Sequence, residues 1–271
     1  MIKLHKINNE VVKPIPLEPI DKNKIKGCNI LDELYGNIAI IAKKKSGKTS
    51  TIFKILKSCS SKYSNVIIFC STIYKDKNWG KIVKYLQDHN IPVFTYTSMF
   101  ENGVNQVEEL TQQLEMENKP KDKKEKEEIK TKFIQCDSDN ESDEECKPRK
   151  SKLVPEYTLI FDDLSGELHN KYLGYLMKRN RHFLMRIIIS TQYYYDIAKD
   201  VRSQLDVILL FPNIPLEKLE TIHKEIDVST PFNIFYALYK NATSEKYNFL
   251  YVDIRNEKYR RNFNFQYEIS Q

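Results

Sequence analysis

Residues 42–49, with the sequence AKKKSGKT, have the composition of a loop that binds phosphate groups. The pattern GxxxxGK[ST] between a strand and a helix forms a P-loop, whose backbone amides surround the phosphates of a nucleotide. Gly47, Lys48 and Thr49 match this pattern, whereas Ala42 stands where the first glycine is usual. Glycine suits that position because it adopts positive φ freely, so alanine there requires a negative φ.

The P-loop pattern predicts a role for each polar group of this loop. Amides at the start of the following helix favour anions, the Lys48 ammonium would reach the β- and γ-phosphates, and the Thr49 hydroxyl would bind Mg²⁺. We therefore expect ATP and Mg²⁺ as cofactors. The predicted nucleotide-binding residues are Ala42, Lys43, Lys44, Lys45, Ser46, Gly47, Lys48, Thr49 and Ser50. The alternative, a lysine-rich surface loop that contains SGKT by chance, fits poorly with the apolar run before it and TSTIFKIL after it.

A second segment, YTLIFDD at 157–163, ends in two carboxylates. Open α/β sheets bind ligands at the carboxyl ends of their strands. We expect Asp162 to hold magnesium, directly or through water, and Asp163 to act as the base that orients the attacking water. Glu167 is the alternative base. A pair of aspartates at the end of a strand can also simply cap the next helix.

A third polar group, Gln192, follows the apolar run RIIIST. Its amide would contact the γ-phosphate or the attacking water. These three strand ends require a sheet whose strands run in parallel, so that their carboxyl ends meet at one edge.

The remaining pattern predicts such a sheet. Continuous apolar runs typical of strands buried on both faces lie at 37–42, 65–71, 92–97, 158–161, 186–190 and 207–211. Helical patterns lie between them at 48–61, 78–89, 103–116, 167–179, 193–203 and 215–226, followed by a predicted helix at 231–243 and a predicted strand at 246–254. This alternation predicts an α/β fold with a mostly parallel sheet between helices.

Composition sets the limits of the domain. A hydrophobic fraction of 41% is enough for a core, and the chain has neither a run of 18 apolar residues nor a signal peptide, so we expect no membrane association and no secretion. The five cysteines show no metal-binding spacing.

We predict an N-terminal extension at 1–35 and an ATPase domain at 36–271, interrupted by a disordered charged insertion at about 115–152. Residues 115–150 hold ten basic and twelve acidic residues, so without them the net charge rises from +6 to +8.

The motifs LIFDDL, NRH at 180–182, IIISTQYYYDI and VRSQLDVILLF, in this order, resemble the DNA-packaging ATPases of large DNA viruses, most closely the poxvirus type. Those proteins belong to the FtsK/HerA group of P-loop motors, with relatives in virophages and virus-like transposable elements. The resemblance covers about 36–212. It implies a P-loop NTPase of the additional-strand type, like RecA, FtsK and HerA. It also implies a homo-oligomeric ring that hydrolyses ATP to move double-stranded DNA into a capsid, in the cytoplasm or nucleus of an infected cell or in the virion.

Ring motors of this kind often place an arginine in the neighbouring subunit's site. Arg181 of NRH and Arg202 of DVRSQ are the candidates, with Arg202 favoured because it follows the Gln192 strand by one short helix. DNA would be contacted through phosphates. Two basic clusters are candidates to line a central channel: Lys178, Arg179, Arg181 and Arg186, and Arg255, Lys258, Arg260 and Arg261.

Other functions remain compatible with these motifs. A P-loop kinase for a nucleotide or other small acceptor usually places the P-loop strand next to the strand that carries the magnesium carboxylate. Here strand signals at 65 and 92 intervene in the sequence. A nucleotide-binding scaffold without turnover and a helicase or DNA-pumping ATPase of another mobile element are the further alternatives.

Overall fold

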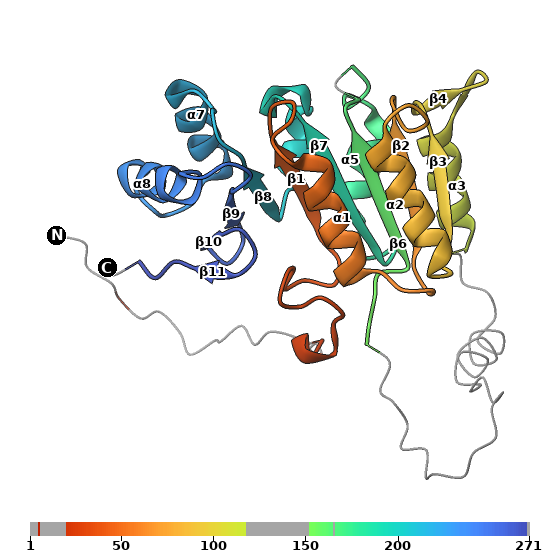
Figure 1. Cartoon of the computed structure of the whole chain (residues 1–271), viewed down its shortest axis with the longest axis horizontal. Coiled ribbons are helices and arrows are strands. Elements are labelled where there is room, and N and C mark those ends of the chain that lie inside the picture. The colour runs from red at the N-terminus through yellow and green to blue at the C-terminus, as the bar shows by residue number, and fades with distance from the viewer. Residues whose placement is uncertain (1–4, 6–19, 118–151, 165, 270–271) are drawn as a thin grey trace, which may run out of the picture.

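The computed structural model describes residue 5 and residues 20–117, 152–164 and 166–269. The predicted insertion at 115–152 and the first part of the predicted N-terminal extension lie almost entirely outside these residues. Figure 1 shows the described part as one sheet with helices packed on both faces.

The sheet contains nine strands in the order β11-β10-β9-β8-β1-β7-β6-β2-β3. Their bounds are β1 Asn37–Ile41, β2 Asn65–Cys70, β3 Val93–Tyr96, β6 Tyr157–Asp162, β7 Met185–Thr191, β8 Val207–Leu210, β9 Leu250–Asp253, β10 Lys258–Arg261 and β11 Phe265–Gln266. The strands from β8 to β3 are parallel, and β9, β10 and β11 continue the sheet in antiparallel fashion. A separate two-stranded hairpin joins β4 Phe100–Glu101 to β5 Val104–Asn105.

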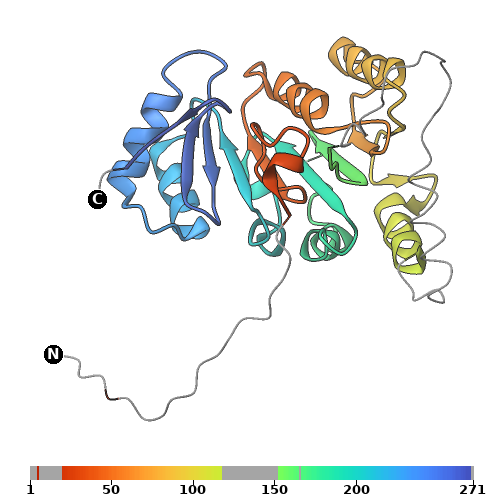
Figure 2. The ribbon, with the colours of Figure 1, turned by 90° about the horizontal axis from the view of Figure 1, so that it is seen from below.

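Helices cover both faces of this sheet. Their bounds are α1 Lys48–Cys59, α2 Lys77–Asp88, α3 Gln106–Glu117, α5 Lys171–Lys178, α6 Lys199–Arg202, α7 Leu216–Ile226 and α8 Phe232–Ala242, with 3₁₀ turns η1 Lys22–Lys24 and η2 Tyr194–Asp196. Viewed from below, α1 and α2 lie on one face, and α3 and α5 lie on the other (Figure 2). The predicted mostly parallel sheet between helices is therefore confirmed.

Alternating side chains of the central strands supply two cores. Ile38 and Ile40 of β1 pack with α1 and α2, whereas Ala39 and Ile41 pack with the helices of the opposite face. All four side chains are buried. This two-sided burial explains why the strands appear in the sequence as continuous apolar runs.

The strand order identifies the additional-strand type. β7 lies between the P-loop strand β1 and the carboxylate strand β6, and pairs in parallel with both. The strands at 65 and 92, β2 and β3, lie on the far side of β6. The separation of β1 from β6 was therefore expected, but the strand that produces it is the one that precedes Gln192.

Three predicted helices differ from the observed ones by more than two residues. The predicted helix at 103–116 starts at Gln106, because Val104–Asn105 form β5. The predicted helix at 167–179 starts at Lys171, because the Asn170 side chain accepts a hydrogen bond from the amide of Tyr172 and caps the first turn. The predicted helix at 193–203 is instead η2 followed by the four-residue α6. Tyr193 and Ile197 have extended backbones, which leaves only these short helical segments.

Candidate nucleotide-binding site

The loop at 42–49 connects β1 to α1 at the carboxyl edge of the sheet. The Ala42 amide donates to the Thr191 carbonyl at 3.0 Å, so the β1–β7 pairing continues one residue beyond β1. Positive φ values in the loop fall on Lys45 at 62° and on Gly47 at 104°, and Ala42 keeps a negative φ. Alanine at the first position thus fits this backbone, whereas glycine is required at 47.

Lys48 lies at the start of α1 and is buried, with 8% of its side chain exposed. Its Nζ donates to Asp163 Oδ1 at 3.0 Å. Asp163 follows β6 with a φ of 52°, and its amide donates to the Ser190 carbonyl of β7 at 3.1 Å. This left-handed turn is uncommon outside glycine and brings the carboxylate to the P-loop lysine. The structure therefore joins two predicted residues that are 115 positions apart.

Asp162 is the last residue of β6 and is 5% exposed. Trp79 Nε1 of α2 donates to its Oδ2 at 3.1 Å. Burial raises the pKa of the Asp162 carboxyl above its ordinary value, and the nearby Ser190 hydroxyl and Lys48 ammonium oppose that shift. Sequence reasoning missed Trp79. As the one tryptophan of the chain, on the apolar face of a predicted helix, it was the available signal.

The second oxygen of Asp162 decides whether Mg²⁺ fits. Among the described residues, Asp162 Oδ1 has no hydrogen-bond partner although it is buried. A buried carboxylate oxygen without a donor is costly unless a cation or water satisfies it. One buried carboxylate oxygen of this kind fits Mg²⁺, which is usually bound through one or two carboxylates together with substrate phosphates.

Glu167, the alternative base, is engaged elsewhere. Its Oε2 accepts hydrogen bonds from the Ser98 hydroxyl at 3.0 Å and from the Met99 amide at 2.5 Å. These bonds fasten the segment after β6 to the loop that follows β3. Within the described residues, the hydrogen bonds of the Glu167 carboxylate go to Ser98 and Met99, and none goes to Lys48.

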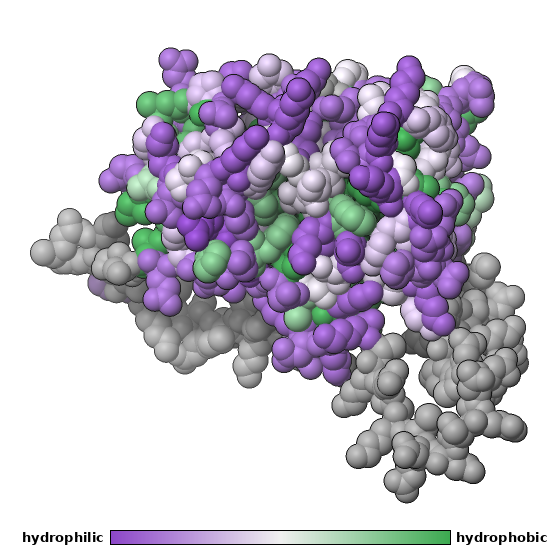
Figure 3. Space-filling view, viewed as in Figure 1, coloured by the Kyte–Doolittle hydropathy of each residue, from purple (hydrophilic) through white to green (hydrophobic). Residues whose placement is uncertain are grey.

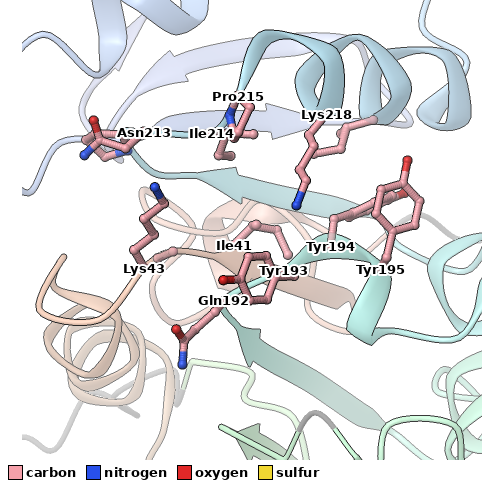
Figure 4. Close-up of a pocket in the computed structure, with 13 residues that line it drawn as sticks. Ile41, Lys43, Gln192, Tyr193, Tyr194, Tyr195, Asn213, Ile214, Pro215 and Lys218 are labelled. Carbon is pink, nitrogen blue, oxygen red and sulfur yellow. The ribbon is translucent and has the colours of Figure 1, made fainter.

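Gln192 follows β7 and lines a cavity of about 130 Å³ between the start of the P-loop and the segments at 193–195 and 212–218. In Figure 4 its amide extends below the cavity, on the side away from Asn213 and Lys218. Because β7 lies between β1 and β6, Gln192 emerges between the P-loop and the two aspartates. The three strand-end groups predicted from the sequence thus occupy one edge of the sheet.

The two candidate arginines have different surroundings. Arg202 has 9% of its side chain exposed, pairs with Glu225 at 2.8 Å, donates to the Ile197 carbonyl, and lies over the rings of Tyr194 and Tyr195. Arg181 has 53% of its side chain exposed, and its ion pair with Glu33 is long, at 3.7 Å. Arg181 lies just before β7, at the edge of the sheet opposite the P-loop.

Two residues of the predicted basic clusters do not face solvent. Arg186 is 1% exposed and donates to the carbonyls of Glu33 and Leu34. Arg260 is 8% exposed and pairs with Asp32 at 2.6 Å. The prediction that these two arginines line a channel is therefore wrong, because both are buried and fasten the segment before β1 to the sheet.

No family model matches the sequence, and no curated protein matches it. Solved structures do match. The genome packaging NTPase B204 from Sulfolobus turreted icosahedral virus 2, in complex with AMP, has a TM-score of 0.51 and 18% sequence identity over 85% of this chain and 98% of that chain. The same NTPase in complex with AMPPCP gives 0.50 and 19% over the same shares. The predicted likeness to viral packaging ATPases is thereby confirmed in the fold, which this chain shares with a viral genome packaging NTPase.

Proposed function

We propose that this protein is an ATPase that couples hydrolysis to the movement of double-stranded DNA and packages a viral or virus-like genome into a capsid. The observation that carries the proposal is the contact between Lys48 and Asp163 beside the buried Asp162. It occurs in a sheet whose β7 separates the P-loop strand from the carboxylate strand. The fold neighbours, which are genome packaging NTPases, support the viral role.

Lys48 and Asp163 form an ion pair at 3.0 Å. Bound triphosphate would compete for the Lys48 ammonium, because phosphate oxygens carry more negative charge than one carboxylate. Release of Lys48 frees Asp163 Oδ1 to accept a proton from the attacking water. We therefore assign the base to Asp163 rather than to Glu167, whose carboxylate already accepts two hydrogen bonds.

The other groups position the reactants. The amides of residues 44–48 would bind the phosphates at the N-terminus of α1, and Gln192 would orient the water near the γ-phosphate. Thr49 and Asp162 would hold Mg²⁺, which neutralises charge on the β- and γ-phosphate oxygens when bound. The buried environment around Asp162 strengthens each of these electrostatic interactions.

The face formed by α1 and α2 supports contact with DNA. Its solvent-exposed lysines are Lys54 and Lys57 on α1 and Lys77, Lys81 and Lys84 on α2. Within α1 there is no acidic residue, and α2 has only Asp88, at its last position. Figure 3 views this side of the molecule, where hydrophilic side chains predominate over the two helices. A face with five exposed lysines and one acid at its far end suits a phosphate backbone read without sequence preference.

The proposed function also involves assembly of several copies of the chain. We infer a homo-oligomeric ring in which an arginine of one subunit reaches the site of the next, and a capsid or packaging protein as the further partner. None of the helices in the described ranges is long and apolar enough to cross a membrane. An infected cell's cytoplasm or nucleus, or the virion, is the location that a packaging role requires.

The test is ATP hydrolysis by the purified chain with and without double-stranded DNA, for wild type, Lys48→Ala, Asp163→Asn and Glu167→Gln. We expect DNA to stimulate the wild-type rate, Lys48→Ala and Asp163→Asn to lower it at least about a hundredfold, and Glu167→Gln to retain most of it. Loss of turnover in Glu167→Gln alone would reverse the assignment of the base.

Two results would replace the proposal. Transfer of the γ-phosphate to a small acceptor would identify a kinase. Tight ATP binding with no turnover, with or without DNA, would identify a scaffold.

A further inference from the structure

An exposed aromatic side chain lies beside the P-loop and has no role in the site described so far. Tyr247 belongs to the loop between α8 and β9, and 55% of it is exposed. Its φ is 72°, a left-handed backbone conformation that is rare and strained for a bulky residue. Such strain persists only where the surrounding structure enforces it, and it is frequent at ligand sites.

The loop around Tyr247 is fixed by short-range hydrogen bonds. The Asn248 amide donates to the Glu245 carbonyl at 3.3 Å, and the Asn248 side chain donates to the Glu245 carboxylate at 3.1 Å. These bonds close a turn at residues 245–248, so the backbone that carries the Tyr247 side chain is fixed.

Tyr247 reaches the tip of the P-loop. A Cβ atom added to Gly47 would lie 3.4 Å from Tyr247 Cδ1 and 3.8 Å from its Cβ. The Tyr247 ring therefore lies within van der Waals reach of the phosphate-binding turn. Lys246 Nζ lies 4.9 Å from the centre of the same ring.

Beside this ring is a hollow of about 410 Å³. Its lining comes from three segments: the P-loop at 43–46, residues 212–213 after β8, and residues 243–247. In Figure 4 the Lys43 side chain extends toward Asn213, which marks the rim shared by the P-loop and the segment after β8. Sites for drug-sized ligands are typically about 300–1,000 Å³. The lining of this hollow is mostly polar, and Tyr247 is the aromatic side chain in it.

The strand order indicates which end of a bound nucleotide would lie in this hollow. β1 has β7 and β6 on one side, where Gln192, Asp162 and Asp163 lie, and β8 and β9 on the other. The γ-phosphate must lie near the carboxylates, so the opposite end of the nucleotide leaves the P-loop toward β8 and β9. The hollow at Tyr247 occupies that side.

We propose that Tyr247 is the stacking platform for the base of the bound nucleoside triphosphate, and that the hollow between the P-loop and residues 243–247 is the nucleobase subsite. The inference rests on the nucleotide site of the proposed function. Every base has an aromatic face, so stacking on one ring tolerates different bases. The subsite therefore serves binding of nucleoside triphosphates in general rather than selection of one base.

The test compares the affinities of the full chain for ATP and for inorganic tripolyphosphate, which has no base, by titration calorimetry. Wild type should bind ATP more tightly than tripolyphosphate. Tyr247→Ala should weaken ATP binding by about fivefold to one-hundredfold and leave tripolyphosphate binding unchanged, because one base stack contributes about 1–3 kcal/mol. Tyr247→Phe keeps the aromatic face and should bind ATP like wild type.

Tyr193→Ala is the matched control. Tyr193 is also exposed, at 51%, also has a lysine over its ring at 4.8 Å, and lines the other cavity beside the P-loop. The Tyr193→Ala variant should bind both ATP and tripolyphosphate with the wild-type affinities. The proposal is overturned if Tyr193→Ala, and not Tyr247→Ala, removes the preference for ATP. It is equally overturned if Tyr247→Ala weakens both ligands together, or if wild type shows no preference for ATP.

These measurements need neither DNA nor turnover. Absence of DNA-stimulated hydrolysis would contradict the proposed function and leave the comparison of ATP with tripolyphosphate intact. Lys48→Ala removes a phosphate contact and should weaken the binding of ATP and of tripolyphosphate in parallel. This pattern distinguishes a loss of phosphate binding from a loss of base binding.

Discussion

Asp162 illustrates the conflict between stability and function at the scale of one residue. Its carboxylate is buried at the end of β6, with one oxygen held by Trp79 and the other without a partner in the described chain. Ionising such a group costs free energy, so the folded protein holds the Asp162 proton more tightly than the unfolded chain does. A cation bound at the free oxygen would remove that cost.

This conflict predicts the behaviour of Asp162→Asn. A raised folded-state pKa means that the contribution of Asp162 to stability is complete below its ordinary value of 3.8 and is lost as the pH rises through the folded-state value. Asparagine does not ionise, and its amide oxygen can still accept from Trp79. We therefore expect Asp162→Asn to unfold a few degrees above wild type at pH 7 without magnesium.

Thermal unfolding from pH 3.5 to 8 checks this prediction. The advantage of Asp162→Asn should shrink toward acid pH and vanish near pH 3.5, and the variant should lose Mg²⁺-dependent hydrolysis. A variant less stable than wild type at neutral pH would mean that the carboxylate is stabilising as it stands.

Residue identities predicted the site better than they predicted the surroundings of its charged groups. The motif at 42–49 and the two aspartates after an apolar run specify their own local environment, because strand ends of a parallel sheet gather at one edge. Arg186 and Arg260 show the opposite case. A basic residue in the sequence looks the same whether it faces solvent or is buried against the carbonyls or the carboxylate of a distant segment.

At the scale of elements, the strands were predictable and their order was not. Each central strand is buried on both faces and so leaves a continuous apolar run in the sequence. Which strand lies between β1 and β6 depends on crossover connections, and nothing within RIIIST states that it inserts there. The short helices at 194–202 were overestimated because Tyr194, Ile197 and Val201 are buried at a spacing that a single helix would also produce.

The lysine face of α1 and α2 carries a prediction about DNA. Lys77, Lys81 and Lys84 lie at helical spacing on one stripe of α2. Replacing all three by alanine should lower DNA affinity and DNA-stimulated hydrolysis while the rate without DNA stays near wild type. The slope of log affinity against log salt concentration should fall by about one for each lysine that contacts a phosphate.

A second triple variant controls for charge. Lys171, Lys199 and Lys240 are exposed on α5, α6 and α8, which pack against the other face of the sheet. Their replacement by alanine removes the same charge from the opposite side of the molecule. Equal loss of DNA affinity in both variants would mean that net charge, rather than the α1–α2 face, binds DNA.

At the scale of the whole molecule, the question is which arginine completes a neighbour's site. Arg202 is held by Glu225, by a backbone carbonyl and by two tyrosine rings, so it is suited to position the segment after Gln192 within its own subunit. Arg181 is exposed, and its ion pair with Glu33 is long, at 3.7 Å. An arginine that acts in another subunit must be free to leave its own surface, and this reverses the preference drawn from the sequence.

We therefore predict that Arg181 acts in trans. Arg181→Ala alone should lower hydrolysis about a thousandfold or more, as loss of an arginine finger does. Mixing it with Lys48→Ala should restore activity, because an intact P-loop in one subunit then meets an intact Arg181 in the next. In a closed ring assembled at random from equal amounts, about one quarter of the sites are complete in this way.

The matching mixture of Arg202→Ala with Lys48→Ala makes the test discriminating. If Arg202 positions residues of its own subunit, its loss and the loss of Lys48 each inactivate the site of the subunit that carries them, and no mixture recovers. Recovery with Arg202→Ala and none with Arg181→Ala would assign the trans role to Arg202. Because Glu225 and two tyrosines enclose Arg202 in the isolated chain, that outcome would also require the segment at 193–202 to rearrange when subunits meet.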